Sequence, residues 1–137
     1  MTLQFNLPPS PALDIVGSQA RFPVGRIFCV GQNYAAHARE MGFEPQRERP
    51  IFFTKSPAAV CPSGAKIPYP PGTSDCNYEC ELVVAIGAPA FRIDPGEALS
   101  VVAGYGVGID LTRRDLQDAA RTKGHPWDTG KDFENAA

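Results

Sequence analysis

Apolar residues gather in four short runs that are separated by turn-forming residues. The first two runs, residues 26–30 and 51–54, are rich in aliphatic and aromatic side chains and are typical of strands. A third run ends at Ile86, before a glycine, and a fourth spans residues 99–110 with glycines that allow close backbone approach. Residues 69–77 contain two prolines and a glycine, and they predict a loop before the third strand.

Two further segments have the signals of short helices. The first runs from Tyr34 to Met41, with an asparagine before it that can cap the helix and a glycine after it that can end it. The second follows Asp110, where Thr112 and Asp115 have the spacing of a capping box and "GHP" provides the stop. The chain is therefore predicted to be a strand-dominated α+β protein.

Composition excludes several classes of protein. The 137 residues suit one domain, and 43% apolar with 20% charged residues is ordinary for a soluble globular chain. A net charge of −2 offers no basic surface for nucleic acid, and no apolar stretch approaches the roughly 20 residues that span a membrane. The N-terminus lacks the pattern of a secretory signal, and four cysteines do not suggest a disulfide framework, so a cytoplasmic location is expected.

Two acidic residues stand directly before the third apolar run, in "YECELVVAIG". Glu79 and Glu81 share one face of the predicted strand, because side chains alternate across a strand. Asp110 follows where the next strand is expected to end and a helix to begin. Three carboxylates favour a hard cation, Mg²⁺, Mn²⁺ or Ca²⁺.

Other interpretations of these acidic residues remain open. The two glutamates also fit a solvated strand edge, and Asp110 also fits a residue that begins a helix. Cys76 and Cys80 raise the possibility of zinc, but no second pair matches them and Cys80 is expected to point away from the glutamates.

Other polar residues have both a catalytic and an ordinary interpretation. His37 and Glu40 are three apart on the first predicted helix, where a carboxylate could orient an imidazole for general-base work. They also fit a surface pair worth only a few tenths of a kcal/mol. Lys131 fits either an active-site cation or a solvated lysine, and Trp127 is expected to pack in the interior.

Five segments in one continuous order resemble the fumarylacetoacetate hydrolase family, and within it the fumarylpyruvate and acylpyruvate hydrolases. They are "NYAAHAREMG", "PIFFTKSP", "YECELVVAIG", "GYGVGIDLTRRDLQ" and "PWDTGKDF". The resemblance implies a mixed β roll with short peripheral helices, assembled as a homodimer. Residues 1–23 would be a lead-in, and residues 24–137 would be a catalytic domain.

The resemblance also implies roles for particular residues. Positions that match Glu79, Glu81 and Asp110 hold Mg²⁺ or Mn²⁺ in the family. Those matching His37 and Glu40 activate water. Finally, Lys131 matches the family's active-site lysine and Gln117 a glutamine that contacts substrate.

The activity implied is metal-assisted hydrolysis of a carbon–carbon bond in a β-diketo acid such as fumarylpyruvate, a small-molecule 2-oxo acid substrate. The alternatives are oxaloacetate decarboxylation or hydroxydienoate isomerisation on the same scaffold, or a non-catalytic metal-binding fragment. Two departures from the family pattern stand out. Gln32 replaces an arginine common in the family, and the sequence stops before a glycine-rich G-T-P segment, which predicts an incomplete fold.

Overall fold

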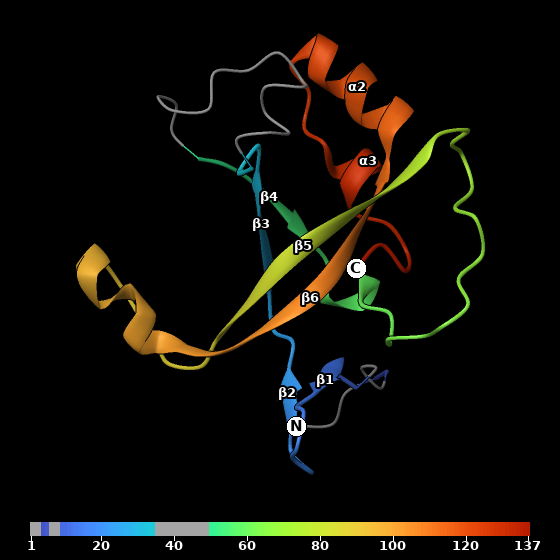
Figure 1. Cartoon of the computed structure of the whole chain (residues 1–137). Coiled ribbons are helices and arrows are strands. Elements are labelled where there is room, and N and C mark those ends of the chain that lie inside the picture. The colour runs from blue at the N-terminus through green and yellow to red at the C-terminus, as the bar shows by residue number, and fades with distance from the viewer. Residues whose placement is uncertain (1–3, 6–8, 35–49) are drawn as a thin grey trace.

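The computed structural model describes residues 4–5, 9–34 and 50–137. Within these residues, the strands pair as three antiparallel two-stranded sheets, β1–β2, β3–β4 and β5–β6 (Figure 1). Short helices connect or follow them, so the expected strand-dominated α+β architecture is confirmed. In chain order the elements are β1 (Ala12–Asp14), β2 (Arg21–Pro23), β3 (Ile27–Gly31), β4 (Ile51–Lys55), a 3₁₀ helix η1 (Pro57–Ala59), β5 (Cys76–Ile86), a 3₁₀ helix η2 (Pro95–Val101), β6 (Val102–Arg113), α2 (Arg114–Lys123) and α3 (Asp128–Lys131).

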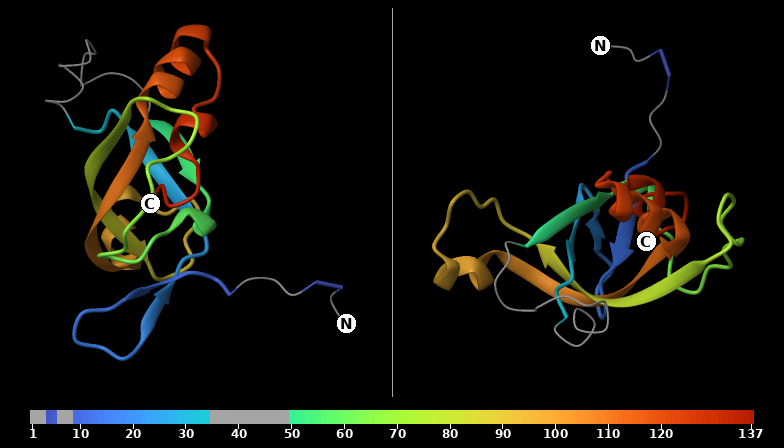
Figure 2. Two further views of the ribbon diagram at one scale, coloured as in Figure 1. Left: turned by 90° about the vertical axis from the view of Figure 1, so that its right-hand side faces the viewer. Right: turned by 90° about the horizontal axis from the view of Figure 1, so that it is seen from above.

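The β5–β6 ribbon is the longest element of the described chain, and it crosses the whole molecule in Figure 1. Helices α2 and α3 lie at one end of the ribbon, and η2 joins its two strands at the other end (Figures 1 and 2). Burial alternates along β5, with odd-numbered residues half-buried and even-numbered residues from Tyr78 onward exposed. The pairing places Glu79 opposite Asp110, and Leu82 opposite Val107. The ribbon therefore has an inner face with carboxylates and an outer face with apolar side chains.

The second sheet, β3–β4, supports α3. The ring of Phe53 on β4 lies 6.0 Å from the ring of Trp127, centroid to centroid, which confirms that Trp127 packs against the sheet. A side chain at Gly31 on β3 would come 3.3 Å from Trp127 Cζ3, so glycine leaves room for the indole. The interior at this junction is polar, since the largest fully buried side chains of the described residues are Lys131 and Thr112.

The second predicted helix begins later than its sequence indicated. β6 continues through Arg113, and α2 starts at Arg114 without a side-chain cap. The predicted capping box is wrong, because Thr112 is still in the strand. Asp115 instead accepts hydrogen bonds from the Thr73 hydroxyl at 2.6 Å and the Ser74 amide at 3.1 Å, outside the helix. The predicted stop is confirmed, since Gly124 adopts the left-handed conformation with φ of 66°.

Three other boundaries also differ from expectation. The loop predicted for residues 69–77 ends earlier, because β5 begins at Cys76. The fourth apolar run begins inside η2, and only from Val102 onward is it a strand. The lead-in, for which no element was predicted, contains the β1–β2 hairpin.

The predicted helix from Tyr34 to Met41 falls almost wholly outside the described residues, as do His37 and Glu40. None of the helices in the described segments is long and apolar enough to cross a membrane.

Candidate active site

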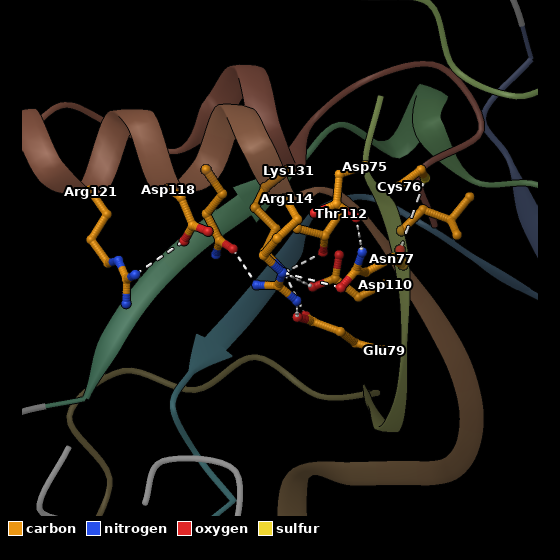
Figure 3. Close-up of polar contacts among 12 residues, drawn as sticks. Asp75, Cys76, Asn77, Glu79, Asp110, Thr112, Arg114, Asp118, Arg121 and Lys131 are labelled. Atoms are coloured by element: carbon orange, nitrogen blue, oxygen red, sulfur yellow. Dashed lines mark hydrogen bonds and ion pairs between the residues drawn. The ribbon is translucent and has the colours of Figure 1, made fainter. Parts of the chain in front are cut away.

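A buried lysine joins the two facing carboxylates of the β5–β6 ribbon. The Nζ of Lys131, on α3, lies 2.5 Å from Oε2 of Glu79 and 2.9 Å from Oδ2 of Asp110. It also donates to the Thr112 hydroxyl at 2.7 Å, which uses all three ammonium donors (Figure 3). Only 2% of Lys131 is exposed. The interpretation of Lys131 as a solvated lysine is therefore wrong.

A second buried lysine approaches Asp110 from the other side. The Nζ of Lys55, at the end of β4, lies 2.9 Å from Oδ1 of Asp110. This is an ion pair without aligned hydrogen-bond geometry, and Oδ1 has no hydrogen-bond partner among the described residues. Asp110 thus sits between two ammonium groups, inside β6 and not at the strand–helix junction that its sequence suggested.

Arg114 completes the cationic side of the site. Its guanidinium donates to Oε1 of Glu79 and to the side-chain carbonyl of Gln117, as Figure 3 shows for the glutamate. Gln117 is buried on α2, one turn after Arg114. Both oxygens of Glu79 are consequently bonded to cations, which favours the ionised carboxylate.

The two glutamates differ in their acidity. Burial opposes ionisation of Glu79, but the hydrogen bonds and charges of Lys131 and Arg114 outweigh it, so its pKa is lowered. Partial burial raises the pKa of Glu81, and the nearby carboxylates of Glu79 and Asp110 raise it further against a hydrogen bond from Tyr34. Glu81 therefore shares the inner face, but among the described residues no ion pair compensates its charge.

Tight packing of α3 on α2 fixes the position of the central lysine. A side chain added at Gly130 would approach the backbone nitrogen of Gln117 to 2.8 Å and its Cα to 3.0 Å. Only glycine allows the two helices to come this close, and the next residue is Lys131. The backbone contact therefore determines where the ammonium lies.

The predicted site residues divide into three groups. Glu79, Asp110, Lys131 and Gln117 come together in one network, whereas Glu81 lies beside it on the same face. His37 and Glu40 lie outside the described residues. Cys80 is exposed on the other face, as its position in the strand predicted.

Sequence reasoning missed Lys55, Arg114 and Thr112 as members of the site. Arg114 carried a usable signal, since it follows Asp110 by four residues in an unusually charged "TRRD" segment. Lys55 carried none, because it lies at the end of an apolar strand 55 residues before Asp110.

The carboxylate oxygens of the inner face are chemically suited to a hard cation, but the three carboxylates do not converge on one point. Among the described residues, no three His, Cys, Asp or Glu side chains form a group that could hold a metal ion. Two carboxylates converge, and lysine ammonium groups lie against them. Oδ1 of Asp110 accepts no hydrogen bond but is paired with Lys55, and no ion pair within the described residues holds Glu81; carboxylate oxygens of this kind suit Mg²⁺ or Mn²⁺.

Residues 26–137 match the family described as fumarylacetoacetate (FAA) hydrolase C-terminal. The chain belongs to the fumarylacetoacetate hydrolase family. The match includes both strands of the ribbon, α2 and α3, and thus every residue of the network described above.

Several relatives carry names that describe an activity. A fumarylpyruvate hydrolase of Ralstonia sp is 53% identical over 90 residues, which are 66% of this chain and 47% of the relative. An oxaloacetate tautomerase of Escherichia coli strain K12 is 37% identical over 88% of this chain and 54% of the relative. The chain therefore spans about half the length of these curated relatives.

A solved structure has nearly the same fold over the shared part. The fumarylpyruvate hydrolase of Pseudomonas aeruginosa, crystallised with Mn²⁺ and pyruvate, superposes with a TM-score of 0.93 at 47% identity. The superposition covers 98% of this chain and 60% of that one. The β5–β6 ribbon and its helices are thus a shared framework.

Proposed function

We propose that this chain provides the cation-binding and lysine-bearing part of an enzyme that hydrolyses a carbon–carbon bond in a β-diketo acid such as fumarylpyruvate. The observation that carries the proposal is the facing pair of Glu79 and Asp110 on the inner face of the ribbon, bound by the buried Lys131. Support comes from the fumarylpyruvate hydrolases of Ralstonia and Pseudomonas aeruginosa that it resembles.

Glu79, Glu81 and Asp110 are the proposed ligands of a divalent cation, Mg²⁺ or Mn²⁺. Once bound, such an ion would act as a Lewis acid toward the 2-oxo acid end of the substrate. Glu81 lies on the same face as the other two carboxylates; burial raises its pKa, and the charges of Glu79 and Asp110 add to this effect. The pyruvate and Mn²⁺ in the Pseudomonas aeruginosa enzyme are in keeping with a 2-oxo acid beside a cation.

Lys131 and Arg114 would provide fixed positive charge where the substrate develops negative charge. Their donors are already oriented by Glu79 and by helix packing, so little reorganisation accompanies the reaction. Gln117, held by Arg114, would contact the substrate. In this proposal His37, oriented by Glu40, takes a proton from the water that attacks the distal carbonyl.

A second activity is supported by the relatives named oxaloacetate tautomerase. Tautomerisation moves a proton next to a carbonyl group and requires no attacking water. The same carboxylates and lysine would serve it, whereas the water-activating role of His37 would change to direct proton transfer. Decarboxylation of oxaloacetate, which breaks a carbon–carbon bond and releases CO₂, and isomerisation of a hydroxydienoate are further reactions proposed for the same scaffold. Homodimer assembly also belongs to the proposal.

Turnover assays distinguish these activities. A purified protein that contains this chain within a complete family domain is given fumarylpyruvate, an acylpyruvate or oxaloacetate with Mn²⁺, and the products are separated and quantified. We expect hydrolysis of fumarylpyruvate, with a kcat that falls by about 10²-fold or more in His37→Ala. Cys80→Ser on the outer face is the control and should be unaffected. Interconversion of oxaloacetate tautomers without any hydrolysis would replace the first proposal by the second.

A further inference from the structure

Lys55 has an unusually complete set of partners for a residue at the end of a strand. It is 3% exposed, and its Nζ donates to the backbone carbonyl of Leu111 at 3.1 Å and to that of Lys131. The third direction of the ammonium faces Oδ1 of Asp110 at 2.9 Å, and the ring of Phe133 lies 5.6 Å from the nitrogen. Burial of a lysine is costly unless its charge and donors are satisfied in this way.

Burial and these contacts keep the Lys55 ammonium away from solvent. Two of its three N–H donors are bonded to backbone oxygens, and Oδ1 of Asp110 is an ion-pair neighbour of the same nitrogen. The bonds of Lys55 therefore join parts of the protein to one another. Lys55 contacts two residues of the site, Asp110 and Lys131, and also Leu111, which follows Asp110 in the chain.

The partners of Lys55 come from the two elements that carry the site. Leu111 is adjacent to Asp110 on β6, and Lys131 closes α3. The next residue reinforces the connection, since the amide of Ser56 donates to Oδ1 of Asp132 at 2.8 Å. The end of β4 thus holds the end of α3 against the inner face of the ribbon.

We propose that Lys55 is a positioning residue: bonded to the Leu111 and Lys131 carbonyls and paired with Asp110, it fixes the Asp110 carboxylate and the Lys131 ammonium relative to each other. Because the cation site itself is proposed, this inference rests on the proposed function. Without Lys55, Asp110 would keep Lys131 as its one cationic neighbour among the described residues, and its carboxylate would be held less firmly. Both the bond to Lys131 and the oxygens offered to a cation would then change.

Three variants test this role. Lys55→Met removes the charge and the donors but keeps an unbranched side chain of similar length. Lys55→Arg keeps the charge, although its planar fork cannot donate in the same three directions. Lys66→Met, in an exposed loop, is the control. Two measurements are made on each: Mn²⁺ affinity by calorimetry, and hydrogen exchange of the Lys131 ammonium by ¹⁵N NMR without metal.

In Lys55→Met we expect Mn²⁺ affinity to fall by about 10- to 100-fold, the usual effect of removing a partner of a metal ligand. Exchange of the Lys131 ammonium should accelerate by about tenfold or more as its hydrogen bonds loosen. Lys55→Arg should lie between wild type and Lys55→Met, and Lys66→Met should match wild type. Adding Lys55→Met to Asp110→Asn should cost little more affinity than Asp110→Asn alone, because both act on one carboxylate.

A lower thermal midpoint with unchanged Mn²⁺ affinity and unchanged Lys131 exchange would show a merely structural role and overturn the proposal. If Lys55→Met does not fold, Lys55→Arg decides, and wild-type values in both measurements overturn the proposal. If the wild-type protein binds no Mn²⁺, the proposed function fails, while the exchange measurement still decides whether Lys55 positions Lys131.

Discussion

The two faces of the β5–β6 ribbon have the same backbone but opposite properties. On the inner face, Glu79 and Asp110 are bonded to Lys131, and Asp110 is 8% exposed. On the outer face, Leu82 is 63% exposed and Val107 is 79% exposed, and the two face each other across the strands. The usual arrangement of a sheet, apolar side buried and polar side in water, is reversed here.

This reversal is the reason for proposing that the inner face is the site of the chemistry. Charged residues are seldom buried unless they are paired, and within the part of the chain that the structure describes, Glu79 and Asp110 on the inner face are paired whereas Glu81 is not. The outer apolar row forms an exposed patch of the kind that interacts with other protein surfaces, which agrees with the proposed homodimer.

Removing the central cation should produce the largest loss of stability. Lys131→Met leaves Glu79 and Asp110 facing each other across the strands, and breaking a buried ion pair in this way costs about 3–5 kcal/mol. Urea unfolding gives the free energy of unfolding. Lys123→Met, on the exposed end of α2, is the control and should stay within about 0.5 kcal/mol of wild type. A loss below about 1 kcal/mol in Lys131→Met would mean that the network contributes little.

The contact between α3 and α2 should be the next most sensitive point. Gly130→Ala places a methyl group 2.8 Å from the Gln117 nitrogen and should destabilise the protein by about 1–3 kcal/mol. Lys131 would shift with the helix, so kcat should fall as well. Gly104→Ala is a matched control, because nothing lies within 4 Å of a side chain added there. Equal unfolding midpoints for the two variants would contradict this packing.

On the outer face, substitution should have little effect on the folding of one chain. Leu82→Thr and Val107→Thr keep a side chain suited to a strand, and each should change the free energy of unfolding by less than about 0.5 kcal/mol. Thermal unfolding at low protein concentration measures this. A loss above about 2 kcal/mol would show that the face is covered in solution, and sedimentation of wild type would then identify a dimer.

A small, pH-dependent effect is expected where the loop before β5 meets α2. The hydrogen bond from the Thr73 hydroxyl, with that from the Ser74 amide, lowers the pKa of Asp115 below its ordinary 3.8. A lowered folded-state pKa contributes stability above the unfolded value, and that stability is lost as the pH falls through the folded value. Asp115→Asn should therefore have a lower thermal midpoint than wild type at neutral pH, and the difference should shrink below pH 3.8. A difference that is constant with pH would contradict this origin.

Much of the fold could be predicted from local pattern. The strands at residues 27–31, 51–55 and 76–86 follow from apolar runs, and the common face of Glu79 and Glu81 follows from alternation. The start of α2 could not be predicted from local pattern. Thr112 is a residue type that often caps helices, but its pairing with Asn77 keeps it in the strand. Tertiary pairing overrides local propensity in such cases.

The site was predictable only in part. Family resemblance identified Glu79, Asp110, Lys131 and Gln117, and the structure brings these four together. No sequence signal could show that Glu79 lies opposite Asp110, since strand register depends on the whole ribbon. The role of Lys55 could not be predicted for a related reason, because it depends on contacts with Asp110 and Lys131, which are distant in the sequence. His37, Glu40 and the ligand role of Glu81 stay predictions.

Mn²⁺ binding by two variants at neighbouring positions tests most directly that the chemistry belongs to the inner face. Glu81→Gln changes a carboxylate on that face, and Leu82→Gln changes the next residue, whose side chain lies on the outer face. In calorimetric titrations we predict that Glu81→Gln weakens Mn²⁺ binding by about tenfold or more, and that Leu82→Gln stays within about twofold of wild type. Equal affinities for the two variants, or a larger loss in Leu82→Gln, would contradict the assignment of the site to the inner face.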